Sequence, residues 1–272
     1  MMNTCSSPAE FFKQIPVLEN KKNKMVAVYT AIFGNYDELK EPEVFDSGVD
    51  YFCFTDNKAL KSNNWNVILL PLLYRDPRLS ARALKVSSHK TMMNYDYSVW
   101  VDGSCKVANS IEDFVFIHCA GENICSFKHK SRDCIYKEAR TCRLKGKDDP
   151  RVINKQMDWY KSMGYPKGNG LIESTILVRK NNEEDVRTLN EEWWKIIESF
   201  SNRDQLSFNF VVWKFGIKHK VLEGGGLSLE SFFYMKPHSK MTFYSRNGKK
   251  INRIRSVLSD TYLKLRLACK QV

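Results

Sequence analysis

A single carboxylate, Asp102, ends the apolar run YSVWVD and is followed at once by Gly103 and Ser104. Aromatic and β-branched residues without charges are typical of a strand that is buried on both faces. In open α/β sheets, ligands bind beyond the carboxyl ends of the strands. An acid at such an end can hold a divalent cation together with phosphate oxygens of a substrate. From its position alone, Asp102 could equally cap the turn that follows.

Two cations, Arg82 and Lys85, lie three residues apart in a segment with helical spacing. Side chains at this spacing share one face of a helix. Together they could bind a diphosphate and offset the negative charge that develops on a leaving group. A solvated helix face is the more common role of such a pair.

The elements that must position these residues alternate between strand and helix. Continuous apolar runs predict strands over residues 25–33, 49–57, 65–73, 97–102 and 171–180. The remaining apolar patterns predict helices over residues 79–93, 111–119, 133–144, 152–164, 183–200 and 203–216. The alternation in the amino-terminal part predicts an α/β fold with a mostly parallel central sheet and helices on its faces.

The composition is that of a globular protein with a strong positive charge. The 272 residues are 43% hydrophobic, which is enough for one large core, and the formal net charge is +12. Such a charge favours phosphate-bearing ligands, nucleic acid or an anionic membrane surface. Eight cysteines without a CxxC pair, several of them inside apolar runs, predict buried free thiols and a reducing compartment. With no signal-like start and no long apolar run, we expect a cytoplasmic protein.

Four motifs in order, YTAIFGNYDELKEP, YFCFTDN, RLSARALKVSSHK and YDYSVWVDGS, resemble the nucleotide-binding half of A-type (GT-A) glycosyltransferases. More narrowly, the sequence is similar to the hexosyltransferase family known from plant mucilage-synthesis proteins and bacterial capsular polysaccharide loci. The later segments FKHKSRDCIYKEA, GLIESTILVRKNN and SNRDQLSF fit the same family. Each motif alone is weak, but the ordered set is fairly specific.

The resemblance implies one GT-A domain with a Rossmann-like sheet over residues 24–245. Residues 24–110 would form the nucleotide-sugar half, and residues 111–245 the acceptor half. We expect residues 1–23 to be a loosely packed leader, because they are polar and lack a clear period. Residues 246–272 are expected to form a basic amphipathic helix.

The resemblance also implies which residues bind the donor. Gly34 would permit close backbone approach and Tyr36 would stack, although both also suit an ordinary turn after a strand. Asp56 would accept hydrogen bonds from the nucleoside or cap a turn. His129, Arg132 and Glu138 lie in the HKSRDCIYKE block, where Arg132 would bind a phosphate or an acidic acceptor. A helix start with ordinary i,i+4 pairing is the alternative for this block. The implied donor-binding residues are Thr30, Ala31, Gly34, Tyr36, Asp56, Arg82, Lys85, Asp102, His129 and Arg132.

The implied metal site departs from the family pattern. Ser104 stands at the second acidic position of the Asp-x-Asp motif, and its hydroxyl adds no charge for a cation. His238 resembles the carboxyl-terminal histidine that closes the metal site in related transferases, although a lone histidine is more often a surface or core residue. The ligands of a Mn²⁺ or Mg²⁺ ion would be Asp102, Ser104 and His238, and metal dependence stays open.

Three residues are candidates for the chemistry. A carboxylate near the acceptor hydroxyl is expected if the reaction inverts the anomeric centre, and Asp204 and Glu173 are the two candidates. Asp204 could instead be an acid in the first turn of a helix. In transferases resembling the glycogenin group, an Asp-Gln pair meets the donor sugar, which would make Asp204 and Gln205 sugar ligands.

These features predict a glycosyltransferase that moves a sugar from a UDP- or GDP-sugar to a glycan or lipid-linked acceptor in polysaccharide or glycoconjugate synthesis. A nucleic-acid-binding protein is one alternative, but the basic residues do not interleave with aromatics in a recognisable binding module, so we expect no nucleic acid partner. A lipid amide hydrolase is another, since a plant member resembling this family is assigned ceramidase activity. No nucleophile elbow or His-rich zinc cluster supports it.

The basic segment 246–272 carries apolar residues at three- and four-residue steps, with Lys and Arg around them. Such a helix could lie on an anionic membrane, with each basic residue worth about 1 kcal/mol, or pack on the core with a solvated basic face. If it lies on membranes, deletion of 246–272 lowers binding to anionic liposomes in a co-sedimentation assay. Unchanged binding would reject the membrane role.

Overall fold

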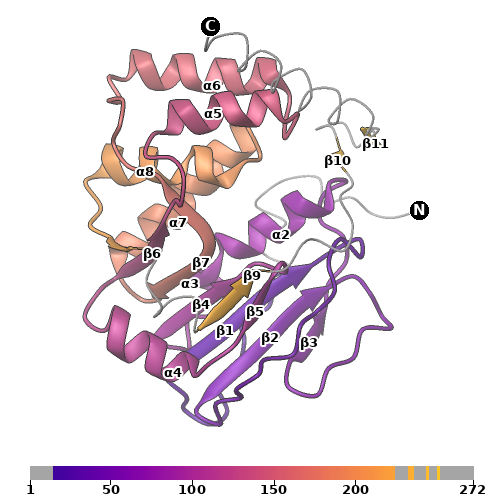
Figure 1. Ribbon diagram of the computed structural model, residues 1–272. Helices are drawn as coiled ribbons and strands as arrows, with labels where there is room; N and C mark the ends of the chain where they lie inside the picture. Colours follow the sequence, from indigo (N-terminus) through magenta and orange to yellow (C-terminus); the bar gives the residue numbers. More distant parts are fainter. Residues whose placement is uncertain (1–14, 224–231, 236–242, 245–249, 252–272) are drawn as a thin grey trace, which may run out of the picture.

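The computed structural model describes residues 15–223, 232–235, 243–244 and 250–251. Its main sheet has the strand order β3-β2-β1-β4-β7-β6-β8 (Figure 1). The strands are β1 (Val26–Ile32), β2 (Val49–Thr55), β3 (Asn66–Leu69), β4 (Tyr97–Val101), β6 (Ile124–Lys128), β7 (Ile172–Lys180) and β8 (Lys220–Leu222). β3, β2, β1 and β4 run parallel, and β7 runs antiparallel to both β4 and β6. The predicted mostly parallel sheet is confirmed.

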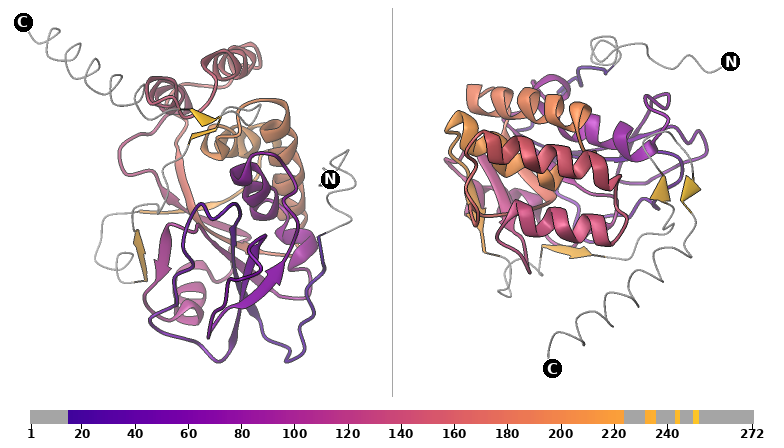
Figure 2. Two further views of the ribbon diagram at one scale, coloured as in Figure 1. Left: turned by 90° about the vertical axis from the view of Figure 1, so that its right-hand side faces the viewer. Right: turned by 90° about the horizontal axis from the view of Figure 1, so that it is seen from above.

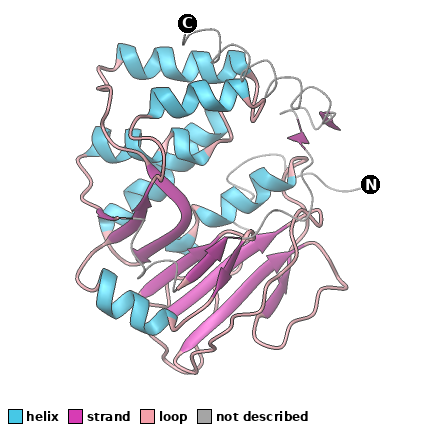
Figure 3. Cartoon of the chain, viewed as in Figure 1, coloured by secondary structure: helices cyan, strands magenta, loops and turns pink. Residues whose placement is uncertain are grey.

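Helices cover both faces of this sheet (Figure 3). One face carries α2 (Pro77–Lys85), α3 (Ser88–Thr91), α5 (Ile135–Leu144), α6 (Pro150–Ser162), α7 (Glu184–Ser199) and α8 (Phe208–Phe215). The other face carries α4 (Ile111–Phe114), which continues into a π-helical turn (Val115–Cys119), and the small sheet of β5 (Cys105–Val107) and β9 (Phe233–Met235). A second small sheet joins β10 (Phe243–Tyr244) to β11 (Lys250–Ile251). In Figure 2 the helices of residues 135–215 gather on one side of the main sheet.

The strand β1 shows why the sheet is buried on both sides. All seven of its residues are buried, as its unbroken apolar sequence predicts. Successive side chains of a strand point to opposite faces. Ala27 and Tyr29 therefore join the core beneath α2 and α7, whereas Val26 and Val28 join the core beneath α4.

Three predicted elements differ from the structure. The strand expected at 65–73 is the short β3, and its four residues are partly or fully exposed because it lies at the sheet edge. The helix expected at 79–93 is broken into α2 and α3, where the Ser87 hydroxyl donates to the Ala83 carbonyl. The segment 203–216 is a short 3-10 turn (Asp204–Leu206) followed by α8. The strand β6 was not predicted.

In the part of the predicted leader that the structure describes, residues 15–23, two side chains pack on the core, whereas Val17, Glu19 and residues 21–23 are exposed. Ile15 and Leu18 are buried, and the Leu18 amide donates to the carbonyl of Thr91. Six cysteines of the described chain are buried free thiols, as predicted. Within the described residues, no helix has the length and apolar character needed to cross a membrane. The predicted basic helix at 246–272 lies outside the described residues, apart from 250–251.

Asn181, at the end of β7, joins three segments of the core. Its side chain accepts from the Ser98 hydroxyl at 2.7 Å and donates to the carbonyls of Met92 and Tyr95 at 2.9 Å each. Asn181→Leu would leave the buried Ser98 hydroxyl and the Tyr95 carbonyl without these hydrogen bonds, so we expect the free energy of unfolding to fall by about 3 kcal/mol in urea titrations. The neighbouring, exposed Asn182→Leu is the control and should change it by less than about 1 kcal/mol. An equal effect of both changes would contradict this account.

Candidate functional site

A cavity of about 600 Å³ lies where β1 and β4 end. Its wall combines the end of β1, the helix α2, the turn after β4, the start of β7 and the loops after β6 and α5. Asp102 follows the last residue of β4 and lines this cavity. The position predicted for it beyond a buried strand is therefore confirmed.

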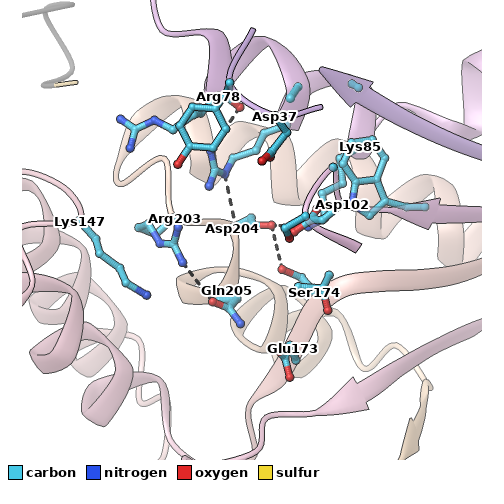
Figure 4. Close-up of a pocket in the computed structure, with 18 of the residues that line it drawn as sticks. Asp37, Arg78, Lys85, Asp102, Lys147, Glu173, Ser174, Arg203, Asp204 and Gln205 are labelled. Atoms are coloured by element: carbon cyan, nitrogen blue, oxygen red, sulfur yellow. Dashed lines mark hydrogen bonds and ion pairs between the residues drawn. The ribbon is translucent and has the colours of Figure 1, made fainter. Parts of the chain in front are cut away.

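A buried carboxylate, Asp204, lies at the centre of the wall (Figure 4). Its Oδ2 accepts from Lys85 Nζ at 2.6 Å and from the Ser174 hydroxyl at 2.8 Å. Its Oδ1 lies 3.5 Å from Arg82 Nε. The prediction that Arg82 and Lys85 share one helix face is confirmed, since both reach the same carboxylate.

These contacts fix the charge of Asp204. Burial alone would raise the pKa of its carboxyl, but the neighbouring Lys85, Arg82 and Arg203 outweigh burial and hold this pKa below its usual value. A carboxylate that binds protons so weakly is a poor general base. Its geometry suits a fixed anion that holds two cations in place.

Lys85 reaches the cavity because of how α2 begins and ends. Asp76 caps the helix by accepting from the Arg78 amide, and Pro77 occupies the first turn. At the other end, the Tyr29 hydroxyl donates to the Lys85 carbonyl at 2.9 Å. The buried Arg179 guanidinium in turn donates to the Tyr29 oxygen. A buried network in the sheet therefore fixes the backbone that presents Lys85.

Neighbouring side chains contact only one of the two carboxylate oxygens of Asp102. Its Oδ1 accepts from Trp100 Nε1 at 2.5 Å and lies 3.4 Å from Lys85 Nζ. Its Oδ2 has no hydrogen-bond partner among the described residues, and a third of the side chain is exposed, at 33%. The carboxylate can therefore accept one further ligand from the cavity.

Asp37 lies close to the turn that follows Asp102. A Cβ atom at Gly103 would lie 3.2 Å from Asp37 Oδ2, which is tighter than most real contacts. Glycine thus allows the Asp37 carboxylate to approach this turn, and both residues line the cavity. Figure 4 shows Asp37 and Asp102 on the same side of the cavity.

The acidic side chains near the end of β4 could supply oxygen ligands to Mn²⁺ or Mg²⁺. Among the described residues, no group of three His, Cys, Asp or Glu side chains converges as a metal site. Asp102 and Asp37 offer hard oxygen ligands, and such ions need only one or two protein carboxylates when a diphosphate supplies further oxygens. The residues therefore fit a metal that is bound together with a diphosphate. Ser104 lines the cavity, while His238 lies outside the described residues.

Glu173 lies at the start of β7 and lines the cavity. Burial raises the pKa of its carboxyl, and the nearby Asp102 raises it further, although Lys130 and Arg132 act in the opposite direction. A carboxylate with a raised pKa is a better proton acceptor than Asp204. Of the two acids predicted from the sequence, Glu173 has the electrostatics of a general base.

The HKSRD block forms one polar cluster in the cavity wall. Arg132 Nε donates to Glu138 Oε2 at 2.5 Å, and Glu138 is fully buried. The His129 Nδ1 accepts from the backbone amides of Ser131 and Arg132, and burial together with Arg132 lowers the pKa of this histidine. Glu138 therefore holds Arg132 by an ion pair, while Arg132 Nη2 lies 3.0 Å from His129 Nε2 and both residues line the cavity.

Some predicted residues do not line the cavity. Thr30 is buried within β1. Gly34 lies in a left-handed turn with φ of 61°, and a Cβ there would lie 2.7 Å from Pro77. Asp56 accepts the Gly34 amide at 2.9 Å, so it fixes this turn from outside the cavity. The predicted residues that do line it are Ala31, Tyr36, Arg82, Lys85, Asp102, Ser104, His129, Arg132, Glu173, Asp204 and Gln205.

Sequence reasoning missed several polar residues of the wall. Asp37 follows Gly34 in a motif that was singled out, so its acid was visible in the sequence. Arg78 lies on α2 at the start of the RLSARALK motif. The others sit in loops or next to named residues, where no periodic pattern marks them. The missed residues are Asp37, Arg78, Lys145, Lys147, Ser174 and Arg203.

Removing the charge of Asp204 should destabilise the protein and make its free energy of unfolding depend less on pH in the acid range. Asp204→Asn leaves Lys85 buried without its anion, so we expect unfolding to become easier by about 3 kcal/mol. Because the folded-state pKa is lowered, Asp204 stabilises the fold above the unfolded-state pKa of about 3.9, and this contribution is lost as the pH falls below it. In urea titrations between about pH 5 and pH 3, the free energy of unfolding should therefore fall more steeply for the wild type than for Asp204→Asn.

The matched control is Asp158→Asn, which breaks an exposed ion pair with Lys161. It should change stability by less than about 1 kcal/mol. The double variant Lys85→Met with Asp204→Asn should recover part of the loss, since the buried Lys85 charge that lost its 2.6 Å partner is then removed as well. An equal acid slope in the wild type and Asp204→Asn would contradict the assignment.

The sequence is similar to two curated plant proteins. It is 25% identical over 226 residues to the "Probable hexosyltransferase MUCI70" of Arabidopsis thaliana, covering 72% of this chain and 38% of that protein. It is 25% identical over 249 residues to the "Alkaline ceramidase TOD1" of Arabidopsis thaliana, covering 75% of this chain and 52% of that protein. The chain thus spans about half or less of the length of these curated relatives.

Among solved structures, the fold is similar to that of the WbbM bifunctional glycosyltransferase. The TM-score is 0.51 at 10% identity, over 76% of this chain and 40% of that chain. This similarity confirms the GT-A-like α/β fold that the motifs imply.

The family comparison covers most of the chain. The pattern described as "TOD1/MUCI70, glycosyltransferase-like domain" matches residues 13–223. This range contains every cavity residue from Ala31 to Gln205. The sequence motifs, the fold and the family pattern agree, and the chain belongs to the TOD1/MUCI70 glycosyltransferase-like domain family.

Proposed function

We propose that this protein transfers a sugar from a nucleotide-diphosphate donor, a UDP- or GDP-sugar, to a glycan or lipid-linked acceptor. The observation that carries the proposal is Asp102, which lies at the carboxyl end of β4, 3.4 Å from Lys85, inside a cavity of a glycosyltransferase-like domain. A parallel-sheet crevice of this kind is where nucleotides bind in α/β folds.

The donor occupies the side of the cavity formed by β1 and α2. Tyr36 and Phe33 line this side and suit contact with the nucleoside. Arg82 and Lys85 bind the diphosphate and stabilise the charge that develops as it departs. Asp204 keeps these two cations in place before the donor arrives, at 3.5 Å and 2.6 Å.

Asp102 and Asp37 would hold a Mn²⁺ or Mg²⁺ ion against the diphosphate. When bound, such an ion would neutralise part of the charge of the leaving nucleoside diphosphate. Asp102 itself keeps its Oδ1 on Trp100 and Lys85, so its Oδ2 is the atom available to the ligand.

Glu173 accepts the proton of the acceptor hydroxyl as that hydroxyl attacks the anomeric carbon. Its raised pKa and its place on the cavity wall support this role. A general base of this kind belongs to a reaction that inverts the anomeric centre. The anomer of the product, read by proton NMR, checks this part of the proposal directly.

The location of the enzyme is part of the same proposal. A cytoplasmic protein at the membrane surface, attached through residues 246–272, could reach a lipid-linked acceptor. The net charge of +12 supports attraction to an anionic surface.

Donor binding can be tested by thermal shift. One nucleoside diphosphate of a panel, with Mn²⁺ or Mg²⁺, should stabilise the protein by about 2.7 kcal/mol at a hundred times its dissociation constant. Arg82→Gln should weaken this binding by about tenfold, because a charge-assisted contact is lost. Arg187→Gln, an exposed change on α7, should leave it unaltered. No stabilisation by any nucleoside diphosphate would overturn the proposal.

The base can be tested by its pH profile. Glu173→Gln should lower kcat by about a hundredfold or more, while the thermal shift with nucleoside diphosphate is retained. In the wild type, kcat should rise with pH until Glu173 is deprotonated, and its raised pKa places this rise above the usual range of a glutamate. The exposed Glu184→Gln should behave as the wild type does. Because one relative is named as a ceramidase, ceramide hydrolysis without sugar transfer would also overturn the proposal.

A further inference from the structure

Two cations, Lys147 and Arg203, face the cavity away from the proposed diphosphate position. Figure 4 shows them on one side of Asp204, with Lys85 and Asp102 on the other. Lys147 follows α5, and Arg203 directly precedes the 3-10 turn that carries Asp204. Both residues line the same cavity as the donor residues.

The two loops that carry these cations are fastened to each other by Asp148. Its Oδ2 accepts from the Ser201 hydroxyl at 2.7 Å and from the Asn202 amide at 2.9 Å. The same Ser201 oxygen accepts from the Arg203 amide at 3.2 Å. Asp148 is buried, so this junction fixes the backbone from which the Lys147 and Arg203 side chains extend.

The carboxylates that favour the charge of Arg203 are Asp204 and Glu138, and both are shared with other cations. Arg203 Nη2 donates to the neutral Gln205 side chain at 3.2 Å, and its Nε is buried without a hydrogen-bond partner among the described residues. The Lys147 ammonium lies 4.0 Å from Glu138 Oε1, but Glu138 already pairs with Arg132 at 2.5 Å.

The two cations also disfavour each other. Burial lowers the pKa of the Lys147 ammonium, and the charge of Arg203 lowers it further. Two neighbouring cations in a partly buried position are stabilised when an anion binds between them. A planar guanidinium beside an ammonium matches the two oxygens of a carboxylate.

We infer that Lys147 and Arg203 form a subsite for the carboxylate of a hexuronic acid unit, so that the substrate is an anionic carbohydrate. The inference rests on the proposed sugar transfer and adds a class of substrate to it. The carboxylate could belong to a hexuronosyl donor or to an acidic acceptor glycan. Both sources present the same group to the same two cations, and separate measurements distinguish them.

The test uses the full chain and two pairs of matched probes. For the acceptor, an oligohexuronate is compared with the same oligosaccharide after its carboxyl groups are reduced to alcohols, with nucleoside diphosphate present. For the donor, a nucleotide hexuronate is compared with the corresponding nucleotide hexose. In one of these two pairs, the acidic probe should bind about tenfold more tightly than its neutral counterpart in calorimetric titrations.

The variants assign this preference to the subsite. Lys147→Gln and Arg203→Gln should each remove most of the preference for the acidic probe. Lys155→Gln removes one positive charge from an exposed position on α6 outside the cavity and should keep the preference. Free nucleoside diphosphate should bind Lys147→Gln as tightly as it binds the wild type.

The outcomes separate this inference from the proposed function. If both probe pairs show no preference, or if the preference survives in both variants, the inference is wrong. It is also wrong if Lys147→Gln weakens free nucleoside diphosphate as much as it weakens the acidic probe, since the cations then serve the diphosphate. If no nucleoside diphosphate binds but the acidic oligosaccharide binds through Lys147, the subsite stands and the donor proposal fails.

Discussion

The buried ion pair between Lys85 and Asp204 is the interaction on which the site depends. Its two residues are 119 positions apart in the sequence, and their side chains are 2% and 7% exposed. A buried charge that loses its partner is costly, so neither residue can leave the other without destabilising the fold. The pair therefore joins α2, from the amino-terminal half, to the turn that precedes α8.

This pair also explains how the cavity keeps its cations in place. Without Asp204, Arg82 and Lys85 would repel each other beside a partly buried carboxylate, Asp102. With it, they are held at defined positions, and the same positive charge is available to the diphosphate of the proposed donor. The Ser174 hydroxyl adds a neutral contact from β7, at 2.8 Å, so the anion is fixed from both sides of the cavity.

Much of the fold could be predicted from the sequence, because several buried strands are largely apolar runs. β1 and β4 have no charged residue and β2 has only Asp50, whereas β7 (IESTILVRK) is apolar mainly in its centre. The order of the motifs identifies the family. The edge strand β3 and the strand β6 were harder to recognise. β3 has no buried residue, and β6 (ICSFK) is short and runs directly into a polar block. Local patterns report burial along one segment, and they do not report where a segment lies in a sheet.

The site was only partly predictable, for a related reason. Asp102 and the α2 cations were found because each belongs to a regular element whose end or face can be located from its period. Lys147 and Arg203 lie in loops, and what brings them together is Asp148, a residue that contacts neither the cavity nor the two cations' side chains in the described structure. A long-range contact of this kind leaves no trace in the spacing of residues. The charge of this part of the cavity can therefore change by loop substitutions, while the strands that position Asp102 and Glu173 stay the same.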